Sequence, residues 1–322
     1  MKRACVLIFL CLPLLLCGCA QKSAEREFFA MDTVMQLRAY GPEADRALAE
    51  AEAEIYRLEG ELSCRDEHAA LARLNEAGGG TVSAETAALL QTALTLCEKT
   101  GGAYDPALGA LSQAWGFSTG AYCVPEQDAL AEAMQRSGAA HAALGGCTVT
   151  LDGGAQLDLG GIAKGYLCDL AQQILTENDI ADYYLSVGDS SAAFGTYMGG
   201  TYNIGVTDPY RPSTTLGTLA CADGTLSTSG LYRRCYTVDG QRYAHIIDGK
   251  SGAPANYYAE SVTVVAPIGG YSAAVADCLT TALSLMTTDE LVDFVNGYAA
   301  ENGLTVIVAA KSTDGRKQLL TN

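Results

Sequence analysis

The stretch from Asp158 to Gln172, DLGGIAKGYLCDLAQ, constrains the fold of this chain more than any other. Glycines and a lysine precede apolar residues at helical spacing, which predicts a helix that buries one face and begins at a glycine-rich turn. The amides and dipole of such a turn favour phosphate oxygens. Gly160, Gly161 and Gly165 would let a ligand approach the backbone, and Lys164 would add positive charge. Since the segment is neither GxGxxG nor a P-loop, an ordinary packed turn into a helix explains it equally well.

The N-terminus is typical of an exported lipoprotein. Lys2 and Arg3 precede an apolar run from Ala4 to Leu16, which is too short to span a membrane. The ending Leu-x-Gly-Cys resembles a bacterial lipobox, which implies cleavage before Cys19 and a lipid anchor on its sulfur. We expect a signal peptide over 1–18, a tether over 19–27, and a chain anchored to the cell membrane that faces outside the cytoplasm. An ordinary signal cleaved elsewhere is the alternative.

The rest of the chain, residues 28–322, has the length and apolar content of a single globular domain, with room for two intimately joined lobes. The net charge of −17 argues against nucleic acid as a partner. An anionic ligand would therefore need local cations or oriented amides. Cysteines outside the export signal are scattered without a C-x-x-C pair, which argues against zinc and leaves disulfide pairing open.

Helices and antiparallel hairpins are mixed along the chain, which predicts an α+β fold with mixed or antiparallel sheets and packed helices. Pro42 and Ser83 are typical of helix starts. Asp152-Gly153 and Asp239-Gly240 are hairpin turn signals between predicted strands. The expected strands are 28–40, 147–151, 155–159, 183–187, 202–206, 216–220, 233–238, 242–247, 261–266, 304–309 and 318–320, and further helices are expected over 125–137, 271–286 and 289–298.

A second motif lies on the predicted helix VADCLTTALSLM, from Val275 to Met286. Asp277 and Thr281 stand at positions i and i+4, hence on one face of the helix. A carboxylate and a hydroxyl presented together suit a hard cation such as magnesium. Taken alone, an aspartate near a helix start is more often a cap or a partner of the dipole.

His245 lies in a third motif, YAHIIDGKSGAPA, at the end of a predicted strand, and is one of only 3 histidines. A single histidine in this position is usually structural, but it is also the side chain that titrates near neutral pH. A fourth motif, STSG from Ser227 to Gly230, is polar and is expected at a strand end, where hydroxyls often satisfy backbone groups.

The order and wording of these motifs are more specific than any one of them. AMDT, SVG, LDLGGIAKGY, STSG, HIIDxxxGxP and ADxxxTAL, between Met31 and Met286, resemble in that order the ApbE family of bacterial FAD:protein FMN transferases. The resemblance implies the fold of the ApbE family and a magnesium-dependent reaction. FAD is cut at its pyrophosphate, FMN passes to a threonine or serine hydroxyl of an acceptor protein, and AMP leaves. The implied acceptor is an exported or membrane-bound electron-transfer protein.

The resemblance also implies the site residues. Magnesium would be held by Asp277, Thr281 and the backbone carbonyl of Gly161. We expect His245 to accept the proton of the attacking hydroxyl, because it is the only matching residue that titrates near neutral pH. The implied flavin contacts are Met31, Ala103, Tyr104, Asp105, Asp158, Lys164, Ile247 and Thr280.

Three positions depart from the family pattern. Asp189 replaces a usual glycine, Gly249 replaces a usual proline, and Arg65 stands where the family often has an aromatic residue beside the flavin. None removes an expected metal ligand. Two rival functions remain open at this point: an FAD pyrophosphatase, in which water replaces the acceptor hydroxyl, and a lipoprotein that only captures flavin. A lipoprotein with a purely structural role would leave the ordered motifs unexplained.

Overall fold

The computed structural model describes residues 22–188, 190–255, 259–269, 272–311 and 317–321. The expected signal peptide, the expected lipidation site Cys19 and the departure at Asp189 lie outside these ranges. Within them, no helix has the length and apolar character needed to cross a bilayer.

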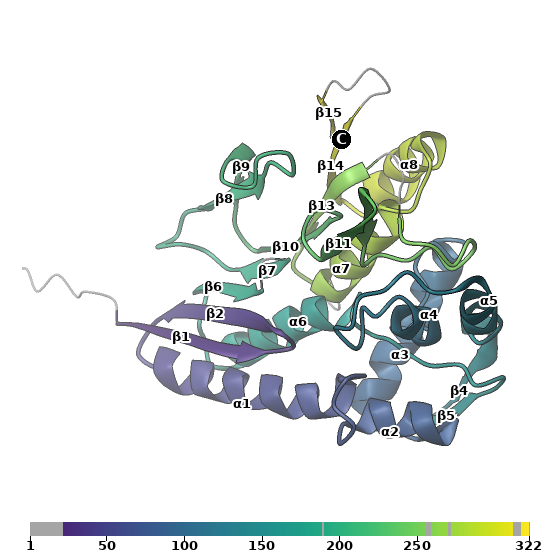
Figure 1. The fold of residues 1–322 in the computed structure, drawn as a ribbon. Coiled ribbons are helices and arrows are strands. Elements are labelled where there is room, and N and C mark those ends of the chain that lie inside the picture. The colour runs from purple at the N-terminus through teal and green to yellow at the C-terminus, as the bar shows by residue number, and fades with distance from the viewer. Residues whose placement is uncertain (1–21, 189, 256–258, 270–271, 312–316, 322) are drawn as a thin grey trace, which may run out of the picture.

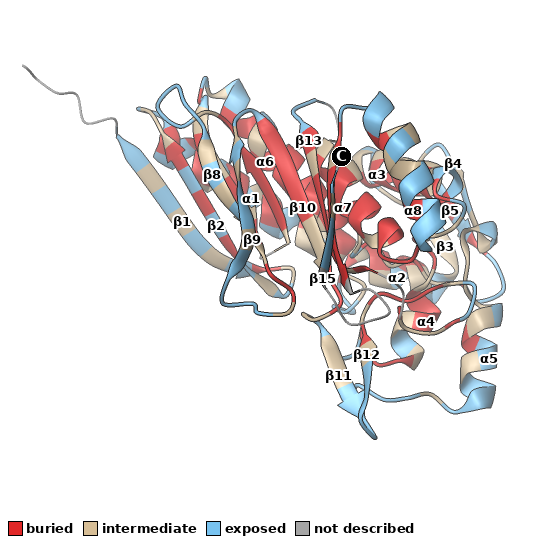
Figure 2. Ribbon diagram, turned by 90° about the horizontal axis from the view of Figure 1, so that it is seen from above, coloured by how far each residue is buried: buried red, intermediate tan, exposed pale blue. Residues whose placement is uncertain are grey.

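An antiparallel sheet of eight strands runs through the molecule in the order β1-β2-β6-β7-β10-β13-β14-β15 (Figure 1). Its most buried strands are in the middle, and β1 is an edge strand with alternating exposure (Figure 2). The strands are β1 (Ser23–Ala30), β2 (Thr33–Tyr40), β6 (Asp182–Val187), β7 (Ser191–Phe194), β10 (Gly224–Gly230), β13 (Ala259–Pro267), β14 (Thr305–Lys311) and β15 (Lys317–Thr321).

Three helices pack together against this sheet: α1 (Ala44–Leu62), α6 (Ala163–Glu177) and α7 (Ser272–Leu283). In α1 the buried residues recur every three or four positions, including Leu48, Ile55 and Leu58, as the sequence predicts. Ser83 caps α3 by accepting the Thr86 amide at 3.0 Å. The remaining helices are α2 (Ala70–Ala77), α3 (Ala84–Lys99), α4 (Gly109–Ala114), α5 (Gln127–Gln135) and α8 (Thr288–Phe294), with a 3₁₀ turn η1 (Ala139–His141) and a π-helical segment η2 (Val295–Ala299).

Smaller sheets surround the main one. A three-stranded sheet is formed by β3 (Gly79–Thr81), β5 (Thr148–Leu151) and β4 (Ala142–Gly145). Two separate hairpins are β8 (Tyr202–Thr207) with β9 (Thr215–Cys221), and β11 (Cys235–Val238) with β12 (Gln241–Ala244). The predicted turn Asp239-Gly240 joins the last pair, and both of its residues have positive φ.

The predicted single strand over 28–40 is a hairpin. Met31 and Asp32 form its turn with φ angles of 50° and 58°, and β1 pairs with β2 on either side. The expected tether over 19–27 is also shorter, because β1 begins at Ser23. The polar residues that suggested a tether belong instead to an edge strand whose outer side chains face solvent.

The predicted hairpin at Asp152-Gly153 is wrong. β5 pairs with β4 across Gly146-Cys147 and with β3 on its other side, so its edges are already occupied. Residues 155–159 form no strand, although Leu157 and Leu159 are buried. The apolar residues of 155–159 are buried without forming a strand, and Asp152-Gly153 favours a turn. In the sequence, the two features together resembled a hairpin.

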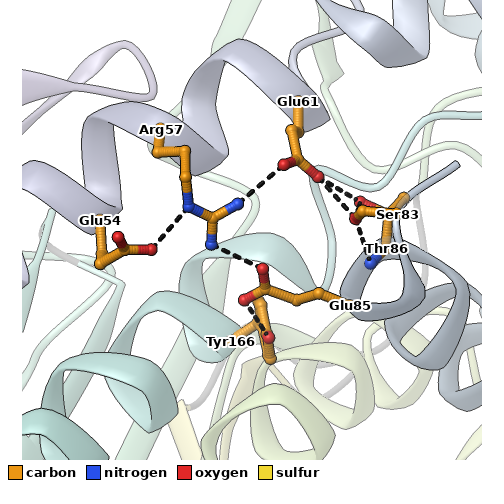
Figure 3. Close-up of polar contacts among 7 residues, drawn as sticks. All are labelled: Glu54, Arg57, Glu61, Ser83, Glu85, Thr86 and Tyr166. Carbon is orange, nitrogen blue, oxygen red and sulfur yellow. Dashed lines mark hydrogen bonds and ion pairs between the residues drawn. The ribbon is translucent and has the colours of Figure 1, made fainter.

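A polar network ties α1, α3 and α6 together (Figure 3). Arg57 of α1 contacts Glu54 at 2.6 Å, Glu61 at 2.7 Å and Glu85 of α3 at 2.6 Å. Tyr166 of α6 donates to Glu85 at 2.6 Å. Burial works to lower the pKa of Arg57, but the hydrogen bonds to Glu54 and Glu85 outweigh it and raise the pKa. The network fixes the first turn of α6 against two other helices.

Candidate active site

A cavity of about 860 Å³ opens where the β1–β2 turn, the start of α6, the face of α7, the end of β10 and the segment after β12 meet. With one exception, every expected site residue in the described ranges lines it. These are Met31, Ala103, Tyr104, Asp105, Asp158, Gly161, Lys164, His245, Ile247, Asp277 and Thr281. The fold thus brings together motifs that are far apart in the sequence.

The glycine-rich start of α6 is already partly hydrogen-bonded within the protein. The Gly160 amide donates to the Asp158 carboxylate at 2.9 Å, and the Gly160 carbonyl accepts from the Lys164 ammonium at 2.9 Å. The Gly165 amide donates to the Asp277 carboxylate at 3.0 Å. The Gly160 and Gly165 amides, which the sequence predicted as possible phosphate donors, therefore donate to carboxylates of the protein itself. Lys164 is the main positive group of this segment.

Gly165 is required by helix packing rather than by a ligand. A Cβ atom there would lie 2.1 Å from the Ala273 carbonyl oxygen, so the backbones of α6 and α7 touch at this point. This close approach is what brings the Gly165 amide to Asp277. Asp169, one turn further along α6, accepts the Ala273 and Ala274 amides at 2.9 Å each and so caps α7 from a neighbouring helix. Burial raises the pKa of Asp169 to about 7.

Asp277 is a buried carboxylate beside a cation. Its side chain is 3% exposed, and its Oδ2 atom lies 3.7 Å from the Lys164 ammonium. Burial raises the pKa of Asp277, while Lys164 and the Gly165 amide oppose that effect. A carboxylate in such a place is stabilised by positive charge.

Thr281 and Gly161 complete one corner of the cavity next to Asp277. A Cβ atom on Gly161 would lie 3.5 Å from the Thr281 hydroxyl, which shows how close the two residues are. A carboxylate, a hydroxyl and a carbonyl are oxygen donors of the kind magnesium prefers. The described residues contain no cluster of three His, Cys, Asp or Glu side chains suited to a metal. The donor set fits magnesium.

Thr280 is the exception among the expected site residues. It is fully buried and does not line the cavity. Its hydroxyl donates to the Asp277 carbonyl at 2.7 Å and is 2.8 Å from the Ser229 hydroxyl. Because Ser229 does line the cavity, Thr280 supports the wall from behind.

His245 also lines the cavity and is half-buried. Its backbone amide and its ring Nδ1 both approach the Arg234 carbonyl, at 2.9 and 3.2 Å. A carbonyl can only accept, so Nδ1 carries the hydrogen and Nε2 is left as a proton acceptor. Burial and the charges of Arg234 and Lys164 lower the pKa of His245 to about 3. The ring is therefore neutral at pH 7.

Three arginines that the motifs did not single out as ligand contacts also line the cavity: Arg65, Arg233 and Arg234. Arg65 and Arg234 both donate to the Phe117 carbonyl, at 2.7 and 3.4 Å, and Arg65 also pairs with Asp32. Two guanidinium groups on one carbonyl concentrate positive charge in an acidic protein. In the sequence, this positive charge was indicated only by the Arg233-Arg234 doublet and by the departure from the family pattern at Arg65.

Two buried hydroxyls of the cavity wall have no hydrogen-bond partner within the described part of the chain, those of Tyr104 and Ser190. Buried polar atoms are rarely left unpaired, so this wall fits a ligand with polar groups of its own. Asp105, in contrast, is satisfied by the Ala107 and Ala139 amides at 2.8 and 2.9 Å.

The chain is similar in sequence to known proteins over most of its length. A model of the ApbE family matches residues 31–308. An FAD:protein FMN transferase of Treponema pallidum (strain Nichols) is 33% identical over 312 residues, covering 83% of each chain. One from Vibrio cholerae serotype O1 is 30% identical over 283 residues, covering 86% of this chain and 80% of the relative.

Solved structures agree with the fold. The ApbE protein of Thermotoga maritima superposes with a TM-score of 0.82 at 28% identity, covering 92% of this chain and 96% of its own. The flavin transferase ApbE of Vibrio cholerae gives a TM-score of 0.80 at 25% identity, covering 94% and 97%. The predicted α+β class with antiparallel sheets and packed helices is confirmed. Sequence and structure together show that the chain is an enzyme of the ApbE family.

Proposed function

We propose that this enzyme transfers FMN from FAD to a serine or threonine hydroxyl of an acceptor protein and releases AMP, with magnesium as its metal. The observation that carries the proposal is the convergence, around one cavity, of an oxygen-donor corner, four cationic side chains and a neutral histidine. The relatives named above are FAD:protein FMN transferases, which supports the same reaction.

In this proposal Asp277, Thr281 and the Gly161 carbonyl hold the metal. When bound, magnesium would offset negative charge on the pyrophosphate oxygens. Lys164 and Arg234 would do the same from the protein, in a chain whose net charge of −17 otherwise repels phosphate. Met31, Ala103, Tyr104, Asp105, Asp158 and Ile247 would contact the rest of FAD.

The chemical step is a displacement at phosphorus. The acceptor oxygen attacks the FMN-side phosphorus, the bond from that phosphorus to the bridging oxygen breaks, and AMP leaves with the bridging oxygen. His245 Nε2 would take the proton from the attacking hydroxyl. Its low pKa in the ligand-free protein is caused in part by Arg234 and Lys164. A bound pyrophosphate would offset those charges and raise the pKa toward a useful value.

The direct test combines the protein with FAD, magnesium and candidate acceptors. Transfer is followed as covalent flavin fluorescence on a denaturing gel, and AMP is quantified in parallel. Equal labelling and AMP release would support the proposal. AMP without labelling would indicate hydrolysis, and tight FAD binding without either product would indicate a flavin-binding protein.

The role of His245 is tested separately with His245→Asn, which keeps a similar shape but cannot take up a proton. We expect FAD to bind normally and transfer to fall by about 10²–10⁴-fold. Full transfer by this variant at pH 7 would remove His245 from the mechanism.

We further propose that the chain is attached to the membrane through a lipid on Cys19 and faces outside the cytoplasm. The support is the lipobox-like ending before Cys19. The acceptor would then be an exported or membrane-bound electron-transfer protein. The test is phase partition of the full chain. We expect the native chain to enter the detergent phase and Cys19→Ser to stay in the aqueous phase. A native chain that stays in the aqueous phase would refute the proposal.

A further inference from the structure

An aromatic cluster lies at one end of the main sheet, away from the cavity. The rings of Tyr40 and Tyr197 are 5.9 Å apart, Tyr197 and Tyr202 are 5.3 Å apart, and Tyr202 and Tyr184 are 5.7 Å apart. Tyr197 is 42% exposed, and its neighbour Met198 is 64% exposed. We call these five residues the tyrosine end. Tyr40, Tyr184 and Tyr202 are partly buried. A tyrosine cluster with an exposed tyrosine and an exposed apolar neighbour at its surface is typical of the membrane interface.

The tyrosine end adjoins the point where the chain enters the fold. Ser23, the first residue of β1, pairs with Tyr40, and the Lys22 carbonyl accepts the Gly41 amide at 2.8 Å. In Figure 1, β1 runs from this edge of the molecule toward its middle. Only three residues separate Cys19 from Ser23 in the sequence, a reach of about 14 Å at full extension.

We propose that the tyrosine end rests in the headgroup region of the bilayer and orients the enzyme on the membrane. The proposal depends on the lipid anchor on Cys19 proposed above. The short connection keeps the tyrosine end near the lipid surface. The attraction is interfacial rather than electrostatic, since the chain is acidic and nearby Arg38 is paired with Glu25 at 2.8 Å.

This orientation has a consequence for the acceptor. The β1–β2 turn, Met31 and Asp32, lines the cavity, and it lies at the far end of β1 from Ser23. The eight residues of β1 span about 26 Å. The active site is therefore held one strand length from the anchored end, and the acceptor presents its hydroxyl there rather than at the lipid surface.

The test uses tryptophan as a depth probe in the full lipidated chain. Met198→Trp places the probe in the tyrosine end, and Val292→Trp on α8 is the matched control, since Val292 is 43% exposed. Figures 1 and 2 both place α8 on the opposite side of the molecule from the start of β1. The native Trp115, the only tryptophan and buried, supplies the baseline.

Each protein is placed on phosphatidylcholine vesicles with and without bromine on the acyl chains. We expect brominated lipid to reduce the added emission of Met198→Trp by about twofold, and to leave Val292→Trp and the native chain unchanged. Flotation of the vesicles is measured first. A chain that does not float overturns both the anchor and this inference. A chain that floats while Met198→Trp is not quenched, or is quenched no more than Val292→Trp, overturns this inference alone.

Discussion

The two sides of the cavity are built in different ways. The helix wall, Lys164, Asp277 and Thr281, is carried by α6 and α7, whose backbones touch at Gly165. The loop wall, Arg65, Phe117, Arg234 and His245, is carried by segments outside helices and strands, which are joined through single carbonyl oxygens.

The difference indicates separate tasks. On the helix wall, the backbone contact at Gly165 and the hydrogen bond from its amide hold the Asp277 carboxylate in place, which suits a fixed corner for a cation. On the loop wall, long arginine side chains can exchange the Phe117 carbonyl for ligand oxygens, which suits binding of an anion. The four predictions below test this division.

Asp277→Asn should have the largest effect. The amide can still accept the Gly165 N–H, but the negative charge that faces the cation corner is lost. We expect transfer to fall by about 10²–10³-fold, while the free energy of unfolding falls only slightly, because the Lys164 side chain left without its partner is 26% exposed and its ammonium can reach water. Labelling assays and urea unfolding measure the two effects.

Asp208→Asn is the matched control, since Asp208 is buried but does not line the cavity. Transfer by Asp277→Asn within a factor of two of the native rate would remove this carboxylate from the helix wall's function.

Gly165→Ala should break the helix contact. The added Cβ would meet the Ala273 carbonyl at 2.1 Å, so α6 and α7 must move apart. We expect a loss of about 2–3 kcal/mol in the free energy of unfolding, together with weaker transfer. Gly60→Ala is the matched control, because Gly60 is also helical and has no atom within 4 Å of the added Cβ. It should be stabilised by about 0.5–1 kcal/mol. Equal stability of the two variants would contradict the backbone contact.

Arg234→Gln should weaken FAD binding without harming the fold. We expect KM for FAD to rise by about tenfold, equivalent to about 1.4 kcal/mol, since one cation that faces the ligand is removed. Arg65→Gln should have a smaller effect, because Arg65 is also engaged by Asp32. The split between KM and kcat decides the point: a fall in kcat with KM unchanged would assign Arg234 to the chemical step instead.

The smallest expected effect concerns His245, whose protonation state should not change with pH near neutrality. Since burial and two cations lower the pKa of His245 to about 3, its ring should stay neutral from pH 5 to pH 8. NMR can follow the ring signals of the 3 histidines in the free enzyme. Lys164→Met should raise the pKa, because it removes one of the opposing charges. A native midpoint between pH 6 and 7 would show that the loop wall is less buried and less cationic than described.

Local pattern predicted the helix wall well and the loop wall poorly. Helical spacing alone identified α6 and placed Asp277 and Thr281 on one face of α7. The contacts of Arg65 and Arg234 with the Phe117 carbonyl join positions 52 and 117 residues apart, and no local pattern records them. His245 was expected, but the resemblance to a family carried that expectation rather than its spacing.

Errors in the fold have the same origin. Asp152-Gly153 is a good local turn, but the competing partners of β5, strands β3 and β4, determine the actual pairing. The polarity of residues 23–27 could not distinguish a tether from an edge strand, since both expose charged side chains. In each case a long-range pairing decided what the local sequence left open.

The contact between Gly165 and Asp277 also determines when the site can exist during folding. The two residues are 112 positions apart, so the hydrogen bond closes a long loop. A chain that has been synthesised only through α6 has Lys164 but no Asp277 or Thr281 to face it. The cation corner thus forms only once α7 has been made and has packed against α6. An unfolded or partly made chain carries none of this site, and its chemistry is confined to the completed protein.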